Sequence, residues 1–442
     1  MFQTFKNAWK VPELKKKLLF TLMIILLYRI GANLFVPYVN LAEVSSMQAR
    51  VDGSIFSFVS LLSGEAFSKA TLFALSVSPY ITASIVMQLL TIALPPLEKL
   101  SKQGEEGKKK INAYTRWVTI ALSLITAYGY VKLLQSWGLT TINSISSTAT
   151  AVAKAEYYFG MAVMVACFCA GAVMIMWLAE QINDHGIGNG ISIILFANII
   201  SGFIPNIYAM IADITTATNA MGYVLGSLKV LLSLALTVAM IGLIVWFTNS
   251  ERRIPIQYAK RVVGRKMYGG QSSNLPLKMN MAGVMPVIFA SSIVSIPATI
   301  AGFIGGGFAT GVQEWFNYDT VLYILVFTAL IFVFSYFYIM ISFNPVEVAN
   351  NIKNNGGAVP GIRPGKPTSD YIKKVLNRIT LLGAFFLIVV SVLPMIVSVF
   401  APTFTSIAFT GTSLLIVVGV ALETVRDIEA QLAMRNYKGF LD

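Results

Sequence analysis

Residues 15–38 read KKKLLFTLMIILLYRIGANLFVPY, which is three lysines followed by an apolar run of about 20 residues. A helix of this length crosses the roughly 30 Å hydrocarbon layer of a membrane. Nine further apolar segments of similar length follow, and ten membrane spans are therefore predicted. The ten predicted spans cover residues 18–38, 71–94, 114–135, 157–179, 187–210, 223–247, 281–303, 320–342, 376–399 and 404–422.

The composition indicates an integral membrane protein. Of the 442 residues, 56% are hydrophobic, which excludes a soluble enzyme with an ordinary core. Cys167 and Cys169 are two residues apart and do not share a helix face, and with the single His185 they cannot form a metal centre. The glycine-rich turn at residues 186–190 has neither the P-loop nor the dinucleotide spacing, so no cofactor is expected.

The charges are distributed unevenly between the two sides of the predicted membrane. Of the 33 basic residues, 27 lie in the N-terminal tail, the 95–116, 248–280 and 342–378 loops and the C-terminal tail. Basic residues near span ends stay on the cytoplasmic side, so both termini are predicted to be cytoplasmic. Two interpretations stay open: the excess charge sets the orientation alone, or it also binds an acidic or RNA-containing partner.

The ten spans divide into two groups of five, at residues 1–215 and 216–442. An odd number of spans per half places related halves in opposite orientations, as in inverted-repeat transporters. Residues 79–86 (PYITASIV) resemble residues 286–294 (PVIFASSIV) and give a weak trace of such a repeat. Spans 2 and 7 carry Pro79 and Pro286 and are expected to kink there.

The predicted outer loop at residues 39–70 contains a half-length apolar run, residues 55–62. Such a segment is either a re-entrant, plug-like helix or an interfacial helix, and both interpretations stay open. The N-terminal tail, residues 2–17, is predicted to form an amphipathic interfacial helix. Apart from Arg29 and Lys229, the polar side chains deep inside the spans are uncharged and are expected to hydrogen-bond between helices: Ser76, Ser78, Thr82, Ser84, Gln88, Ser192, Asn198, Ser291 and Ser292.

Three long motifs resemble the SecY family of protein-conducting channel subunits. They are residues 73–90 (FALSVSPYITASIVMQLL), 177–193 (WLAEQINDHGIGNGISI) and 275–286 (LPLKMNMAGVMP). Shorter matches are GEEGK at 104–108, YAKR at 258–261, VPGIRPG at 359–365 and GTSLLI at 411–416. The resemblance covers essentially the whole chain and is closest to bacterial forms.

The resemblance implies an all-α, polytopic protein of ten transmembrane helices in two inverted five-helix halves around a central hourglass pore. It implies passage of unfolded secretory polypeptides and lateral release of transmembrane segments into lipid. The implied pore ring is Val77, Ile81, Leu195, Ile288 and Ile416. The implied plug comprises Ile55, Phe56, Phe58, Val59, Leu61, Leu62 and Gly64. The implied lateral gate, between spans 2 and 7, comprises Thr82, Ser84, Gln88, Ser291, Ser292 and Ile296.

The resemblance also implies partners. Arg265, Lys266 and Arg363 match positions at which the family binds the ribosome and the SecA motor ATPase. SecE and SecG subunits, signal peptides, nascent membrane helices and membrane lipid complete the expected set, in a bacterial cytoplasmic membrane. The chain itself is expected to be no enzyme, because it carries no nucleotide-binding loop.

Two departures from the family pattern concern how tightly the channel closes. The family often has two glycines where this chain has Gly64 and Glu65, and it tends to be apolar where Ser76 and Ser78 flank Val77. Two other classes of function do not fit the sequence. A secondary transporter would need intramembrane carboxylates, and an ion channel would need a selectivity filter; the sequence offers neither.

Overall fold

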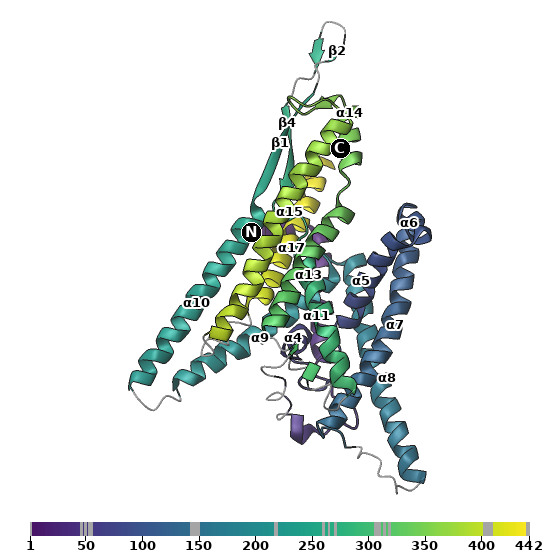
Figure 1. The fold of residues 1–442 in the computed structure, drawn as a ribbon, viewed down its shortest axis with the longest axis vertical. Helices are drawn as coiled ribbons and strands as arrows, with labels where there is room; N and C mark the ends of the chain where they lie inside the picture. Colours follow the sequence, from purple (N-terminus) through teal and green to yellow (C-terminus); the bar gives the residue numbers. More distant parts are fainter. Residues whose placement is uncertain are drawn as a thin grey trace. The chain divides into compact units, whose positions relative to one another are not determined.

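The structure is a computed structural model that describes residues 2–44, 47, 51, 56–141, 151–215, 220–258, 261–263, 266–268, 272–304, 311–312, 315–316, 320–400 and 410–438. Helices dominate (Figure 1). They are α1 (Phe2–Lys10), α2 (Pro12–Gly31), the short η1 (Leu41–Glu43), α4 (Phe56–Ser63), α5 (Ser78–Ala93), α6 (Pro95–Ser101), α7 (Glu105–Ser136), α8 (Ala151–His185), α9 (Gly190–Thr215), α10 (Ala220–Asn249), α11 (Met285–Ile304), α13 (Val321–Ser342), α14 (Pro345–Asn354), α15 (Lys366–Phe400) and α17 (Thr410–Lys438). The strands are β1 (Glu251–Tyr258), β2 (Arg261–Val263), β3 (Lys266–Tyr268), β4 (Ser272–Lys278) and β5 (Gly357–Ala358).

Each predicted span overlaps one of these helices. Among the described residues, five helices are by themselves long and apolar enough to cross a membrane: Glu105–Ser136, Lys154–His185, Gly226–Asn249, Val321–Asn354 and Lys366–Ile396. The bent pair α5 and α6 makes a sixth if it is counted as one span. The protein is therefore helical with several membrane-crossing helices, and the count of ten spans stays a prediction.

Pro79 of span 2 and Pro286 of span 7 lie in the first turns of helices and do not kink them, so that expectation was wrong. Pro79 lies in the first turn of α5, and Pro286 is the second residue of α11. The first backbone N–H groups of a helix have no intrahelical partner, so proline is tolerated there. The sharp bend lies at the other end of α5, where the chain turns by 104° into α6 just before Pro95.

The described chain forms two compact units, each treated separately below. Unit 1 comprises Met1–Val230, Ser291–Ile324 and Val420–Asp442, and unit 2 comprises Leu231–Ala290 and Leu325–Gly419. These units follow contacts within the chain and not internal symmetry. The proposed halves, 1–215 and 216–442, therefore stay a prediction.

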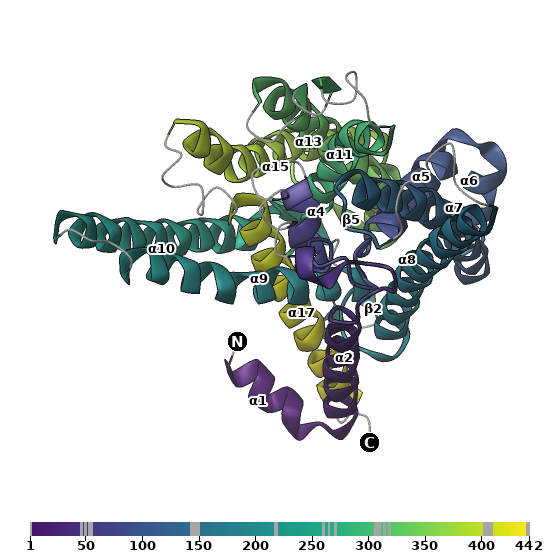
Figure 2. The same ribbon diagram turned by 90° about the horizontal axis from the view of Figure 1, so that it is seen from below.

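Unit 1 is built on closely packed helices around buried aromatic rings. α7 lies along α8, and α5 packs against α7 (Figure 2). The ring of Tyr130, which is fully buried, meets that of Phe168 edge-on at 5.0 Å, and its hydroxyl donates to the carbonyl of Phe67 at 2.6 Å. This contact fixes the chain after α4 to the α7/α8 pair.

Of the amphipathic helix predicted for residues 2–17, the part Phe2–Lys10 is present as α1. The chain turns sharply at Val11, and residues 12–17 belong to α2 (Figure 2). Ala8 of α1 is buried in a small apolar cluster with Leu14, Ile187 and Ile428. The next residue, Trp9, is half exposed, with the Lys15 ammonium 5.5 Å from its ring. One face of α1 therefore packs against protein, and the other is free for the membrane interface.

Unit 2 contains the strands, which the sequence analysis did not predict. β1 pairs with β4 in antiparallel register, Ile254 opposite Leu275, and β5 pairs with the other edge of β1. Ile254 and Ile256 alternate with exposed residues along β1 and face one buried cluster. That cluster also contains Leu277, Ala349, Ile352, Val359, Ile372, Leu376 and Ile379. The loops 248–280 and 342–378 therefore form one folded platform.

Candidate functional site

The half-length helix predicted before the second span is present as α4. Gly64 ends it with φ 62°, the left-handed conformation that glycine adopts without steric cost. Its N–H bonds to the carbonyl of Leu61 at 3.0 Å, and the N–H of Glu65 bonds to the carbonyl of Ser60 at 2.9 Å. This pair of bonds is a Schellman motif, which is a defined helix C-terminus.

The implied plug residues on α4 are largely buried. Phe56, Leu61 and Leu62 are each under 9% exposed, and Val59 is half-buried. The ring of Phe56 stacks on that of Phe67 at 5.7 Å and meets Trp137 edge-on at 5.9 Å. Ile55 and the side chain of Phe58 lie outside the described residues. α4 is thus a seated helix held by apolar contacts.

A mostly apolar cavity of about 240 Å³ lies beside α4 within unit 1. Four elements line it: α4, α5, α7 and the part of α11 that belongs to unit 1. Its lining includes Phe56, Val59 and Leu62 from α4, Pro79 and Thr82 from α5, Ile125 and Tyr130 from α7, and Ser292, Ile296 and Ile300 from α11. The structure therefore brings the predicted plug and residues of both predicted gate helices around one cavity.

Three of the six implied gate residues line this cavity: Thr82, Ser292 and Ile296. Ile296 is 37% exposed. Ser84, Gln88 and Ser291 do not line it. Ser84 instead accepts a 3.4 Å hydrogen bond from Gln88 Nε2 on the same helix, and Ser291 is buried. The gate assignment as a whole stays a prediction.

The implied pore-ring residues are all buried. Val77, Ile81 and Leu195 belong to unit 1, and each is under 5% exposed. Ile288 and Ile416 belong to unit 2 and are 5% and 1% exposed. Burial suits an aliphatic constriction and equally suits ordinary helix packing, so the ring stays a prediction.

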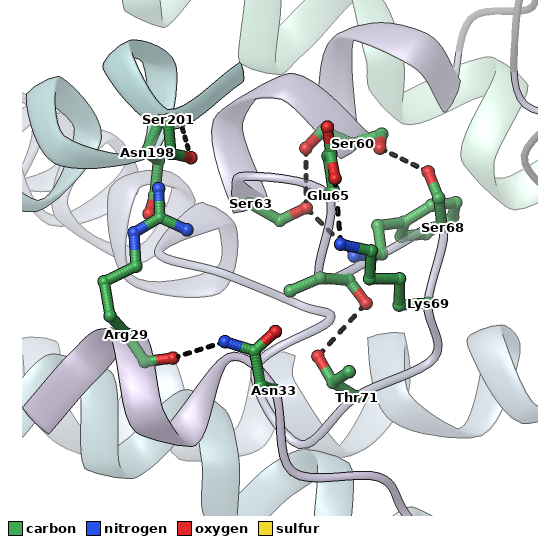
Figure 3. Close-up of polar contacts among 12 residues, drawn as sticks. Arg29, Asn33, Ser60, Ser63, Glu65, Ser68, Lys69, Thr71, Asn198 and Ser201 are labelled. Carbon is green, nitrogen blue, oxygen red and sulfur yellow. Dashed lines mark hydrogen bonds and ion pairs between the residues drawn. The ribbon is translucent and has the colours of Figure 1, made fainter. Parts of the chain in front are cut away.

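A polar cluster beside α4 contains functional candidates that the sequence analysis did not assign (Figure 3). Asn198 of α9 donates from Nδ2 to the carbonyl of Leu62 at 2.7 Å and to the hydroxyl of Tyr28 at 2.8 Å. Ser76, just before α5, donates to the same carbonyl of Leu62 at 2.9 Å. Asn198 therefore hydrogen-bonds between helices, as predicted, but its partner on α4 could not be read from the sequence.

Arg29 lies in the same cluster, on α2 (Figure 3). Its Nη2 donates to the carbonyl of Ala197 at 3.0 Å. A Cβ built on Gly64 would lie 3.1 Å from Arg29 Nη1, so the guanidinium sits against the end of α4. A positive charge stabilises the C-terminal end of a helix. In the sequence, Arg29 could be recognised as a candidate because it is a charged residue inside an apolar segment.

Arg363 stands in an exposed turn of the unit 2 platform, between Pro360 and the start of α15. Its backbone carbonyl accepts a 2.9 Å hydrogen bond from Thr368 Oγ1, which ties the turn to the first turn of α15. Lys266 lies on β3, and nothing is described of its side chain; Arg265 lies outside the described residues. Because β1 pairs with β5, the two basic loops present one combined surface.

In the part of the chain that the structure describes, the site offers no centre for a metal ion. Within the described ranges, no group of three or more His, Cys, Asp or Glu side chains lies close enough to hold one. The chemistry of the cavity is therefore that of an apolar surface with a few hydroxyl groups, which can take up an apolar segment by partitioning.

Comparisons with known proteins agree on one family. The family model described as SecY matches residues 71–425. The protein translocase subunit SecY of Streptomyces galbus is 42% identical over 448 residues and covers 100% of both chains. The subunit of the same name from Mycobacterium tuberculosis is 41% identical over 456 residues, again covering 100% of both.

Solved structures share the fold at low sequence identity. A protein-conducting channel has a TM-score of 0.65 at 16% identity, covering 96% of each chain. A SecY structure, described as one whose plug domain stabilises the closed state and maintains a membrane seal, has a TM-score of 0.59 at 17% identity and 96% coverage of each chain. Sec61 from the canine ribosome–channel complex has a TM-score of 0.59 at 14% identity with the same coverage.

Proposed function

Because the chain belongs to the SecY family, we propose that it is the pore subunit of a protein translocase. In this role it passes unfolded secretory polypeptides across the bacterial cytoplasmic membrane and releases transmembrane segments into the lipid. The observation that carries the proposal, beside the family, is the apolar cavity that α4, α5, α7 and α11 share.

The cavity explains how substrates are selected. Burying one large aliphatic side chain gains about 1.5–3 kcal/mol, so an apolar signal segment gains free energy by entering between α5 and α11. A charged segment loses several kcal/mol there, because nothing in the apolar lining replaces its hydration. Thr82 and Ile296 line the cavity from the two gate helices. Parting these helices would let the bound segment partition into lipid.

The five implied ring residues would form the constriction through which the polypeptide slides. A narrow aliphatic ring sheds water and so blocks ions, yet it offers no hydrogen bond that would hold a passing chain. Seated α4 would close this constriction from outside. In the related SecY structure, the plug domain is described as stabilising the closed state and maintaining a membrane seal. The channel then needs no chemistry of its own, and the driving force comes from its partners.

The unit 2 platform is the proposed landing surface for those partners. A ribosome presents RNA phosphates, which bind arginine and lysine in a salt-dependent way. The related Sec61 structure was determined in a ribosome–channel complex, which supports this partner. SecA, SecE and SecG are proposed on the family resemblance, with both termini of this chain in the cytoplasm.

The proposal is tested by trapping a translocation intermediate. Single-cysteine channels are made in a background without Cys167 and Cys169, with the probe at Ile81 or at Leu22, which is 56% exposed on α2. A stalled nascent chain should crosslink at position 81 and not at the lipid-facing control. Crosslinks at position 22 alone would contradict a route through the channel.

A binding assay separates the channel from a solute transporter. Reconstituted vesicles should bind ribosomes or SecA, and binding should fall as salt rises. A transporter of small solutes would bind neither partner at any salt concentration.

A further inference from the structure

The carbonyl groups at the end of α4 are satisfied in two different ways. The Schellman motif at Gly64 uses the carbonyls of Ser60 and Leu61. The motif does not use the carbonyl of Leu62. This carbonyl accepts hydrogen bonds from two side chains elsewhere in unit 1. These are Asn198 Nδ2 at 2.7 Å and Ser76 Oγ at 2.9 Å. One backbone oxygen thus joins α4 to α9 and to the segment that leads into α5.

Both donors are buried and held in place. Asn198 is 0% exposed and is oriented by its second bond, to the Tyr28 hydroxyl at 2.8 Å. Ser76 is 1% exposed and adopts φ 51°, a left-handed conformation that is costly for a residue with a Cβ. A strained residue persists when its surroundings fix it, and such residues gather at sites with a mechanical role.

The two contacts respond differently to movement. Ser76 precedes the first residue of α5, Ser78, by two positions, so a shift of α5 carries its hydroxyl away from Leu62. Asn198 belongs to α9, which packs directly against α4, and so its contact persists until α4 itself moves. A signal segment that displaces α5 would therefore break one bond and leave α4 held by the other.

We propose that Asn198 and Ser76 are positioning residues that latch α4 in its seated place, and that they thereby set how strong a signal sequence must be to open the channel. The inference rests on the proposed role of α4 as a plug. It gives the polar residue at position 76 a sealing function, although that residue departs from the apolar pattern of the family.

The test removes the donors singly and together. Asn198→Leu keeps a similar branched shape without a donor, and Ser76→Gly removes the hydroxyl at a φ value that glycine accepts. Each single variant leaves one donor on the carbonyl of Leu62, so ion conductance through reconstituted channels should rise about twofold or less. The double variant leaves a buried acceptor without a donor, and conductance should rise about tenfold or more. Export of a preprotein with a weakened signal should rise in parallel.

Ser201→Ala is the matched control. Ser201 lies on the same helix as Asn198, but its hydroxyl bonds to the carbonyl of Asn198 at 2.8 Å and not to α4 (Figure 3). This variant should leave both conductance and signal stringency at the parent level. Each variant is also compared with the parent for thermal unfolding in detergent, so that general destabilisation is recognised.

A direct readout of α4 keeps the inference falsifiable. A cysteine at Val59, with Cys167 and Cys169 replaced, reports by its reaction rate with a membrane-impermeant thiol reagent. The rate should rise about tenfold in the double variant and stay unchanged in Ser201→Ala. An unchanged rate and conductance in a well-folded double variant would overturn the latch.

A channel that lacks residues 56–63 separates the latch from the plug itself. Raised conductance in this deletion together with a tight double variant would refute the latch and keep the plug. Unchanged conductance in the deletion would refute the plug role on which the proposed function relies.

Discussion

Gly64→Ala is expected to loosen the seated α4 and open the channel. Gly64 has φ 62°, and a left-handed conformation costs a residue with a Cβ about 1–2 kcal/mol. The new Cβ would also lie 3.1 Å from Arg29 Nη1, 3.1 Å from Asn198 Oδ1 and 3.3 Å from the Asn198 Cα. The first two neighbours are side-chain atoms and can shift, but the Cα belongs to the backbone of α9. Together these effects amount to about 2 kcal/mol.

If displacement of α4 relaxes the turn, that free energy shifts the equilibrium from seated to displaced roughly thirtyfold. The assay is ion flux from vesicles that contain the purified channel, with the rate normalised to the amount of protein. The expected result is a flux at least about tenfold above that of the parent channel.

Gly138→Ala is the control for this experiment. Gly138 has φ 73°, but nothing lies within 4 Å of a Cβ built on it. This variant carries the same backbone strain away from α4, so it should lower the free energy of unfolding by about 1–2 kcal/mol and leave ion flux unchanged. A Gly64→Ala channel that folds and closes as tightly as the parent would refute the reasoning about α4.

Two further predictions concern the constriction and the platform. Ile416→Asn or Ile288→Asn should hydrate the implied ring, so ion leakage and export of weak signal sequences should both rise in reconstituted vesicles. If conductance and signal selectivity both stay at the parent level, neither residue belongs to the ring. Arg363→Glu should abolish SecA-dependent export by charge repulsion at an exposed turn, with little effect on folding. Lys99→Glu, a charge reversal at another exposed residue, on α6, is its control. Normal export by the Arg363 variant would remove that residue from the docking surface.

The helices could be predicted from the sequence because hydrophobicity is a local signal. Each of the ten apolar segments contains a helix, and the half-length run became α4. The starts of α5 and α11 were less predictable, because Pro79 and Pro286 fit both a kinked helix and a helix N-terminus. Only the tertiary structure shows which alternative the chain adopts.

The strands of the unit 2 platform were not predicted, although the sequence contains part of the pattern that indicates them. Ile254 and Ile256 lie two residues apart, on either side of Pro255, and this spacing of two is the period of a half-buried strand. The 248–280 loop was interpreted by its basic residues and not by its hydrophobic periodicity. Pairing of β1 with β5 joins segments about a hundred residues apart and depends on register, which a single sequence does not encode locally.

The contacts of the polar cluster beside α4 could not be predicted from the sequence, for a different reason. Arg29 and Ser76 could be singled out, one as a charge inside a span and the other as a departure from an apolar pattern. Their effects depend on where the end of α4 lies, because a hydrogen bond requires two groups within about 3 Å of each other. From the sequence, Ser76 was noted only as a departure that bears on how tightly the channel closes. In the structure its hydroxyl donates to the carbonyl of Leu62 on α4.

The measurement that tests the account most directly is to tie α5 to α11. A Thr82→Cys, Ile296→Cys channel without Cys167 and Cys169 is oxidised, or treated with a short bismaleimide if the two Cα atoms are more than about 7 Å apart. Both residues line the cavity in unit 1, so the link closes the proposed entrance for substrates. A control pairs Thr82→Cys with the parent Ile296 and cannot be linked. The account predicts that the linked channel fails to export a preprotein and that reducing the disulfide restores export. Full export through a channel verified as crosslinked would contradict entry of substrates between these helices.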